Sequence, residues 1–537
     1  MKTCHACIVA VASISLAGCQ TGKHLNKVPS TMAPVKHWPH APYEKRNDTR
    51  AADGLDQEET LALHRELRSL VDIHQAPSAR EIEIWQQLQK PQWGSYPHLE
   101  LKIVNGELKK NGHMSDELWG MGGGCMSYAE RLYRLDDRSY LPILTQYGDV
   151  ILSGRNDPHT GLFSEEDGAC PPVFVRSMPR LKPGEQMWRI HKYLRKFTYD
   201  NAEDQAKHDE LIARPQSVEY EYLLQGALLQ GVANAAIWIL DHPEVHDLEP
   251  PRVPSVKFQS GGTYLEKATA YLLAMQEIFD YFERQRHFDK HLGVWMNPFD
   301  RNKTEQTHVQ REDGIWEVKY RALPLNRYMI FNHAYLVTGI GLQKLDPEKY
   351  GLWRQRARHV AKRGFDFWRE HMVNSALIKA KHDYPESNQY GPIYYWGYAA
   401  DGGDTEDMVH LSMELQAMLG MNRWERFFTE EDIKAVANMV CTATYNYDAQ
   451  SLNRNIFRNP APAKKMVHYR YAPSYGGLVG KYMPDDAYEE FIDEQFRLWD
   501  ERLAAGKLER TDAYSMPFEI LKARLNRYGK DNWLNLR

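Results

Sequence analysis

The sequence predicts an all-α fold in which helical hairpins close into a ring of inner and outer helices. Segments with helical hydrophobic periodicity recur from residue 118 to residue 527. Tight turns alternate with long aromatic and glycine-bearing connections at 293–323, 384–404 and 449–480. This alternation is expected if one end of a barrel is trimmed and the other end carries a site.

The first 19 residues combine a basic start, a short apolar core and small residues before a cysteine. This pattern predicts a signal peptide over residues 1–18. Leu16-Ala17-Gly18-Cys19 resembles a bacterial lipobox, so Cys19 is the expected lipidation site, and Gln20 fits the outer-membrane sorting pattern. We therefore expect a lipid-anchored protein of the bacterial cell envelope, in the outer membrane and facing the periplasm or the cell surface.

The remaining chain predicts a flexible tether over residues 19–55 and one catalytic domain over residues 56–537. The tether is polar, contains proline and lacks periodicity. No later stretch reads as long and apolar enough to cross a membrane, so we expect membrane contact only through the lipid. Cys125, Cys170 and Cys441 lack metal-site spacing and leave room for one disulfide.

Within the domain, leucines at helical spacing predict a first helix over residues 58–74. Alternating apolar and polar residues around Asn105-Gly106 predict a small β-hairpin at 98–112. Paired helices follow, and further helices are predicted at 218–240, 263–288, 487–508 and 515–527. The predicted pairs are 118–135 with 140–152, 326–345 with 350–368, and 405–419 with 424–445, with turns at 136–138, 346–348 and 420–423.

The start of the third pair carries the first candidate site. Asp404 or Thr405 can cap the helix, and Glu406 and Asp407, expected in its first turn, can both reach His410. The upstream rings of Tyr395, Trp396 and Tyr398 suit the apolar faces of a sugar. Alternatively, the acids only cap the helix and His410 is a core histidine.

Two further segments gather polar or cationic groups. Pro324 precedes a helix on which Asn326 and His333 share nearly one face, with Arg327 and Asn332 close by; a plain N-cap and a core histidine are the alternative. Although the formal net charge is -5, residues 449–484 contain no acid. This window predicts an anionic ligand or a solvated basic loop, and it includes Arg458, Lys465, Arg470, Tyr471 and Tyr475.

Over about residues 56 to 510, these features together resemble the α/α-toroid polysaccharide lyases that cleave uronate polymers such as alginate or glucuronan. The resemblance rests on Leu323-Pro324-Leu325-Asn326, the aromatic segment from Tyr394 to Tyr398, the Glu406-Asp407-x-x-His410 element and the later Tyr/Arg segment. It implies an incomplete barrel of helical hairpins and cleavage by β-elimination, without a cofactor or metal.

The resemblance also implies residue roles. His410 matches the family histidine, Tyr471 or Tyr475 is the best tyrosine candidate, and Arg470 and Asn332 are candidates to neutralise the substrate carboxylate. Phe331-Asn332-His333 stands where better-known alginate lyases have Asn-Asn-His, so a tyrosine, His410 or His333 is the base. The expected substrate-binding residues are Tyr395, Trp396, Tyr398, Glu406, Asn326, Arg327, Arg458 and Lys465.

The expected partner is therefore an anionic polysaccharide rather than nucleic acid, which an envelope protein seldom meets. Two other functions fit the same residues. A glycoside hydrolase would use two carboxylates from the set Glu386, Asp401, Asp404, Glu406 and Asp407. A glycan-binding lipoprotein would use the rings without catalysis. The sequence has no glycine-rich phosphate loop, His-Glu-x-x-His helix or calcium loop, which disfavours nucleotide and metalloprotease chemistry.

Overall fold

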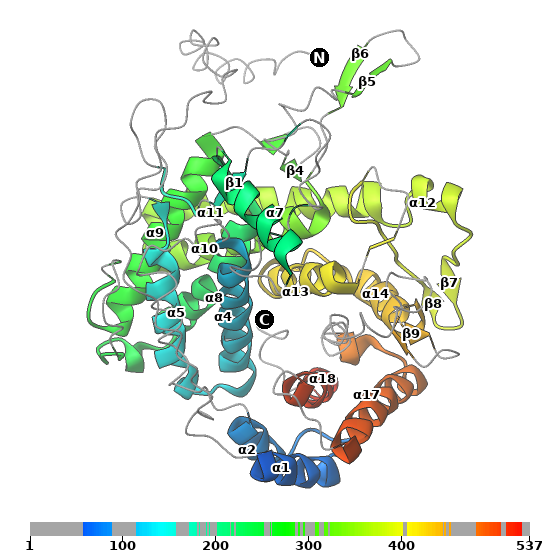
Figure 1. Ribbon diagram of the computed structural model, residues 1–537. Coiled ribbons are helices and arrows are strands. Elements are labelled where there is room, and N and C mark those ends of the chain that lie inside the picture. The colour runs from blue at the N-terminus through cyan, green and yellow to red at the C-terminus, as the bar shows by residue number, and fades with distance from the viewer. Residues whose placement is uncertain are drawn as a thin grey trace, which may run out of the picture.

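The computed structural model of the chain is mainly helical, which confirms the predicted all-α class at that level (Figure 1). The predicted signal peptide, Cys19, the tether and the hairpin at 98–112 lie outside the residues that the structure describes. Those residues are 57–88, 114–156, 171–174, 176–179, 182, 190, 193, 201–214, 216–219, 222–251, 258, 260–284, 288–289, 294–295, 307–310, 316–319, 323–400, 405–406, 408–443, 445–446, 451–452, 479–505 and 512–528.

Two of the predicted hairpins form as expected. α4 (Met114–Leu135) leads through the short helix η2 (Arg138–Tyr140) into α5 (Leu141–Ser153). α10 (Leu325–Leu345) and α11 (Pro347–Phe367) are separated by Asp346 alone. The Asp346 side chain accepts a hydrogen bond from the Lys349 amide at 2.9 Å, and Pro347 occupies the first position of α11. An acid cap followed by proline starts a new helix immediately.

The turn predicted at 420–423 was wrong. α13 (Met408–Glu425) continues through Gly420, and the break comes at Arg426, whose φ of 49° is left-handed, before α14 (Glu430–Ala443). A Cβ at Gly420 would lie 2.7 Å from ring atoms of His333 on α10. This glycine therefore serves the close approach of two helices rather than a turn.

The predicted start of α13 was also too early. The helix begins at Met408, so Thr405 does not cap it and Glu406 precedes its first turn. Asp404 and Asp407 lie outside the described residues. Glu406 nevertheless lies 3.4 Å from His410, although the helical spacing on which that expectation rested does not include Glu406.

The centre of the molecule is built on α8 (Tyr222–Asp241) and α10, which pack against each other. α8 also packs against α4 and α9 (Tyr264–Arg284), and α10 packs against α11 and α13. By length and apolar composition α8 could cross a bilayer, so the expectation that no later stretch could do so was wrong. However, 89% of its most apolar window is buried inside the structure, as a core helix requires.

The first and last described helices pack together. α1 (Gln57–Leu70) lies against α17 (Asp485–Ala505), and α2 (Ala79–Leu88) lies against α18 (Asp512–Arg527) (Figure 1). Glu81 and Arg524 form a buried ion pair across this contact. The helices predicted near both ends of the domain are thus confirmed, and none of their described residues forms a β-sandwich.

Short helices and two-stranded antiparallel ribbons fill the long connections between the helical hairpins. Residues 218 and 219 lie in β2 rather than in the predicted helix. Cys125 is free and buried, Cys441 is buried, and Cys170 lies outside the described residues. The ribbons are β1 (Arg176–Pro179) with β2 (Gln216–Glu219), β3 (Phe288–Asp289) with β4 (Val294–Trp295), β5 (Thr307–Gln310) with β6 (Trp316–Lys319), β7 (Ser387–Asn388) with β8 (Gly391–Pro392), and β9 (Tyr445–Asn446) with β10 (Ser451–Leu452). The short helices are α7 (Ala202–Ala213), α12 (Ala376–Lys381), η5 (Pro243–Val245), η6 (Trp368–Met372) and η8 (Gly480–Tyr482).

Candidate functional site

The aromatic segment, residues 393–398, connects the starts of α10 and α13. The Leu325 amide at the start of α10 donates to the Tyr398 carbonyl at 3.0 Å. The Glu406 amide, just before α13, donates to the Trp396 carbonyl at 2.8 Å. The segment therefore brings together the two helix starts at which the sequence places candidate site residues.

Asn374 fixes the other end of this segment. Its amide donates to the Tyr395 carbonyl at 2.7 Å, and its side chain accepts from the Tyr395 amide at 2.9 Å and donates to the Ile393 carbonyl at 3.0 Å. Asn374 has a φ of 47°, a left-handed conformation that asparagine tolerates. The sequence pattern gave no signal for this residue.

Tyr395 and Trp396 are fully buried, so they do not offer the stacking surface expected of substrate-binding rings. The Trp396 indole donates to Glu414 at 2.7 Å and meets Trp368 edge-on at 5.4 Å between ring centroids. Both side chains pack into the core and anchor the aromatic segment there. Tyr398 is only partly buried and is the ring of this group that remains available to a ligand.

His410 lies beside both Glu406 and Tyr398. Its Nδ1 is 3.4 Å from Glu406 Oε1, within ion-pair distance when the imidazole is protonated. The Tyr398 and His410 rings are 4.9 Å apart and inclined by 36°. The His410 side chain is 33% exposed whereas that of Glu406 is 1% exposed, so a buried carboxylate lies beside an imidazole that solvent partly reaches.

Asn326 and Arg327 stand in the first turn of α10, next to the Tyr398 carbonyl. Asn326 is 1% exposed, and among the described residues its Oδ1 has no hydrogen-bond partner. Pro324 takes the N-cap position and makes no side-chain cap. Asn326 is therefore not the N-cap, and a buried amide of this kind costs free energy unless a ligand or water completes it.

Asn332 and His333 lie in the packed core rather than at these helix starts. Asn332 accepts a hydrogen bond from the Trp295 indole at 2.8 Å, and His333 Nδ1 is 3.0 Å from Gln230 Oε1. Both are fully buried, and burial lowers the pKa of His333 to about 3. The roles expected for them, carboxylate neutraliser and base, do not fit this environment, and we assign both to core packing.

The remaining candidates, Arg458, Lys465, Arg470, Tyr471 and Tyr475, lie outside the described residues, as do Asp401 and Asp404. Glu414 was missed, although its spacing carries a signal. It follows His410 by four residues, so the two lie one turn apart on the same side of α13.

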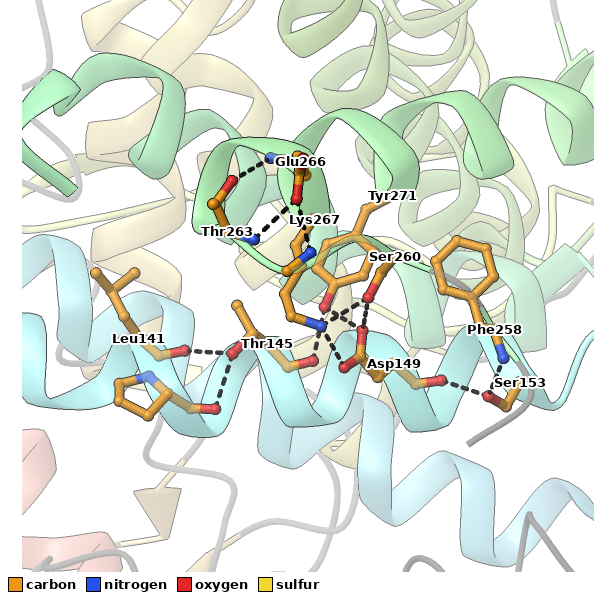
Figure 2. Close-up of polar contacts among 12 residues, drawn as sticks. Leu141, Thr145, Asp149, Ser153, Phe258, Ser260, Thr263, Glu266, Lys267 and Tyr271 are labelled. Atoms are coloured by element: carbon orange, nitrogen blue, oxygen red, sulfur yellow. Dashed lines mark hydrogen bonds and ion pairs between the residues drawn. The ribbon is translucent and has the colours of Figure 1, made fainter. Parts of the chain in front are cut away.

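A second polar cluster joins α5 to α9 (Figure 2). Asp149 accepts from Lys267 at 2.6 Å, from Ser260 at 2.5 Å and from Tyr271 at 2.6 Å. All four side chains are buried, and their one positive and one negative charge balance. The cluster is satisfied by its own members, so we interpret it as structural.

In the described part of the chain, no three His, Cys, Asp or Glu side chains are grouped so that they could hold a metal ion.

Comparison of the chain with family models, curated proteins and solved structures gives no match.

Proposed function

We propose that the chain is a polysaccharide lyase that cleaves a uronic-acid polymer, of the alginate or glucuronan type, by β-elimination. The observation that carries the proposal is the group of Tyr398, His410 and Glu406 beside Asn326 at the joined starts of α10 and α13. A partly exposed imidazole can act as a base, a ring can stack on a sugar face, and a buried amide oxygen without a donor among the described residues can accept from a sugar hydroxyl.

In this proposal Asn326 Oδ1 accepts a hydrogen bond from a sugar hydroxyl, and Arg470 receives the substrate carboxylate at C6. Its neutralisation acidifies the C5 proton, which His410 removes while Glu406 stabilises the imidazolium. The electron pair forms the C4–C5 double bond, and the C4–O4 bond breaks. A tyrosine protonates the departing O4, for which Tyr471 and Tyr475 remain candidates, and Arg458 and Lys465 are further contacts to the anionic polymer.

The test is an ultraviolet assay for the conjugated unsaturated uronate on alginate, glucuronan, pectate and glycosaminoglycans. His410→Ala is expected to lower kcat by about 100- to 10,000-fold, the usual contribution of a general base. His371→Ala is the matched control, because this histidine is 51% exposed and lies on η6. Absence of product on every polymer, or equal effects of His410→Ala and His371→Ala on kcat, would contradict the lyase proposal.

We also propose that the hairpins form an α/α toroid. Support comes from the packing of α8 against α4 and α10, from that of α10 against α13, and from the contacts of α1 and α2 with α17 and α18. An inner ring of this kind has its helix starts at one end, where the long connections lie. An experimental structure in which these starts point to opposite ends would contradict it.

The envelope location is part of the same proposal. Lipidation of Cys19 would place the domain, through residues 19–55, beside polymers that enter or coat a bacterial cell. Metabolic labelling with a fatty acid should mark the wild-type protein, and Cys19→Ala should abolish both the label and recovery in the membrane fraction. Labelling that survives this substitution would refute the anchor.

A glycoside hydrolase on the same framework is the second candidate. It is favoured by Glu406 and Glu414, two buried carboxylates that stand four residues before and four residues after His410 in the chain. A hydrolase needs its two carboxyl groups about 5 to 9.5 Å apart across the cut bond. New reducing ends without an ultraviolet-absorbing product would select it. Binding that survives His410→Ala, without turnover on any polymer, would instead select a glycan-binding lipoprotein.

A further inference from the structure

Glu414 is joined to His410 by a closed series of contacts. The Glu414 carboxylate accepts from the Trp396 indole, the Trp396 carbonyl accepts from the Glu406 amide, and the Glu406 carboxylate lies 3.4 Å from His410. His410 and Glu414 are one turn apart on α13, which closes the series. The orientation of Glu406 therefore depends on where Trp396 is held.

The Trp396–Glu414 bond is suited to hold a ring firmly. Both side chains are fully buried, and an N–H donated to a carboxylate is stronger than one donated to a neutral acceptor. Trp368 packs edge-on against the same indole. Since a buried carboxylate carries a large desolvation cost, an acid at this position needs a partner that exploits its charge.

We propose that Glu414 is a positioning residue: by holding Trp396 it sets the orientation of Glu406 and Tyr398 around His410. The importance of Glu414 for catalysis rests on the proposed function. Its effect on the orientation of the groups around His410 does not. The segment that Glu414 holds also carries the Tyr398 ring, so the same bond sets how a sugar ring would lie against the imidazole.

The core supplies a matched control. The Trp295 indole donates to Asn332 Oδ1 at 2.8 Å, and this pair is also buried, but among the described residues neither side chain hydrogen-bonds to the aromatic segment. Glu414→Leu and Asn332→Leu each remove the acceptor of a buried indole. A merely structural effect would be shared by both substitutions.

The experiment follows the His410 ring-proton signals by NMR, in the full-length protein, with Tyr398→Leu as reference for loss of the neighbouring ring. In Glu414→Leu we expect these signals to move toward the reference, and in Asn332→Leu we expect them to stay. Glu414→Gln keeps an acceptor for the indole and should restore the wild-type signals. Trp396→Phe removes the donor and should repeat the leucine result if Glu414→Leu does not fold.

The positioning role would be overturned if the His410 signals are unchanged in Glu414→Leu. If Glu414→Leu does not fold, unchanged signals in Trp396→Phe would overturn it. A Glu414→Gln variant that fails to restore the wild-type signals would overturn it as well. On a substrate that the wild type cleaves, Glu414→Leu should lower kcat by about 100-fold, as expected for a small misplacement of reacting groups. The NMR result needs no substrate. A wild type that never turns over a uronate polymer therefore refutes the lyase proposal and leaves the positioning result to be judged separately.

Discussion

Lys267 and Asp149 form an ion pair inside the core, with Nζ 2.6 Å from Oδ2, although 118 residues separate them in the chain. Their side chains are only 4% and 3% exposed. Ser260 and Tyr271 complete the hydrogen bonds of the carboxylate, as Figure 2 shows. The pair therefore ties α5 to α9.

Replacing one partner of this pair should therefore be costly. Lys267→Met leaves the Asp149 carboxylate buried without its cation, and we expect a loss of about 3–5 kcal/mol in the free energy of unfolding. Chemical denaturation at pH 7 measures this. Lys344→Met is the control, because its pair with Asp241 is partly exposed and should be worth less than about 1 kcal/mol. Equal losses in the two variants would contradict the structural role assigned to the cluster.

His64 should make the protein sensitive to acid. It is fully buried beside Trp499, and within the described ranges neither ring nitrogen has a hydrogen-bond partner. Burial lowers its pKa from 6.5 to about 4. Below pH 6.5 His64 is therefore protonated in the unfolded chain, whereas in the folded chain it stays neutral until the pH approaches 4. Stability from this residue is constant above pH 6.5 and falls as the pH drops toward 4.

His64→Phe removes this proton linkage without breaking a hydrogen bond. The variant should resemble the wild type in stability at pH 7. At pH 5 it should be more stable by about 2 kcal/mol, because pH 5 lies 1.5 units below the His64 pKa of 6.5 in the unfolded chain. Denaturation at both pH values gives the difference. His371→Phe, at an exposed position, controls for the general effect of replacing a histidine with phenylalanine. A constant difference between His64→Phe and the wild type at both pH values would count against the buried neutral imidazole.

Gly420→Ala should destabilise the contact between α13 and α10. The added Cβ would lie 2.7 Å from the His333 ring, and both groups belong to packed helices. Forced overpacking of this kind costs about 1–3 kcal/mol. Gly351→Ala on α11 meets no heavy atom within 4 Å and should be neutral or stabilising, by up to about 1 kcal/mol. Thermal unfolding compares the two, and similar shifts would show that the close approach has no energetic importance.

Tyr398 is expected to act through its ring. Tyr398→Phe keeps the surface beside His410, whereas Tyr398→Ala removes it. A stacking contribution of about 0.5–1.5 kcal/mol predicts a roughly 2- to 13-fold weaker affinity for uronate oligosaccharides in the alanine variant only. Calorimetric titration measures it. Equal weakening by phenylalanine would assign the contribution to the hydroxyl instead.

Helices were predictable where periodicity and local caps act together, as at Asp346-Pro347 between α10 and α11. Prediction failed at Gly420, because a glycine that admits a neighbouring helix looks the same in sequence as one that ends a helix. The predicted contact between Glu406 and His410 is present, although Glu406 precedes α13 and is held there by its backbone bond to Trp396. The burial of Asn332, His333 and Trp396 could not be predicted, since it depends on partners such as Trp295, Gln230 and Glu414 that are distant in the chain.

The packing of α1 and α2 against α17 and α18 has a consequence for synthesis of the chain. Glu81 lies 443 residues before its partner Arg524, so this ion pair cannot form until nearly the whole described chain has been made. Contacts this distant also carry the largest loop-closure cost. Of the described helices, α1 and α2 are thus synthesised first and dock among the last. Until they dock, their apolar faces, including Trp85, are exposed to solvent or covered by a chaperone.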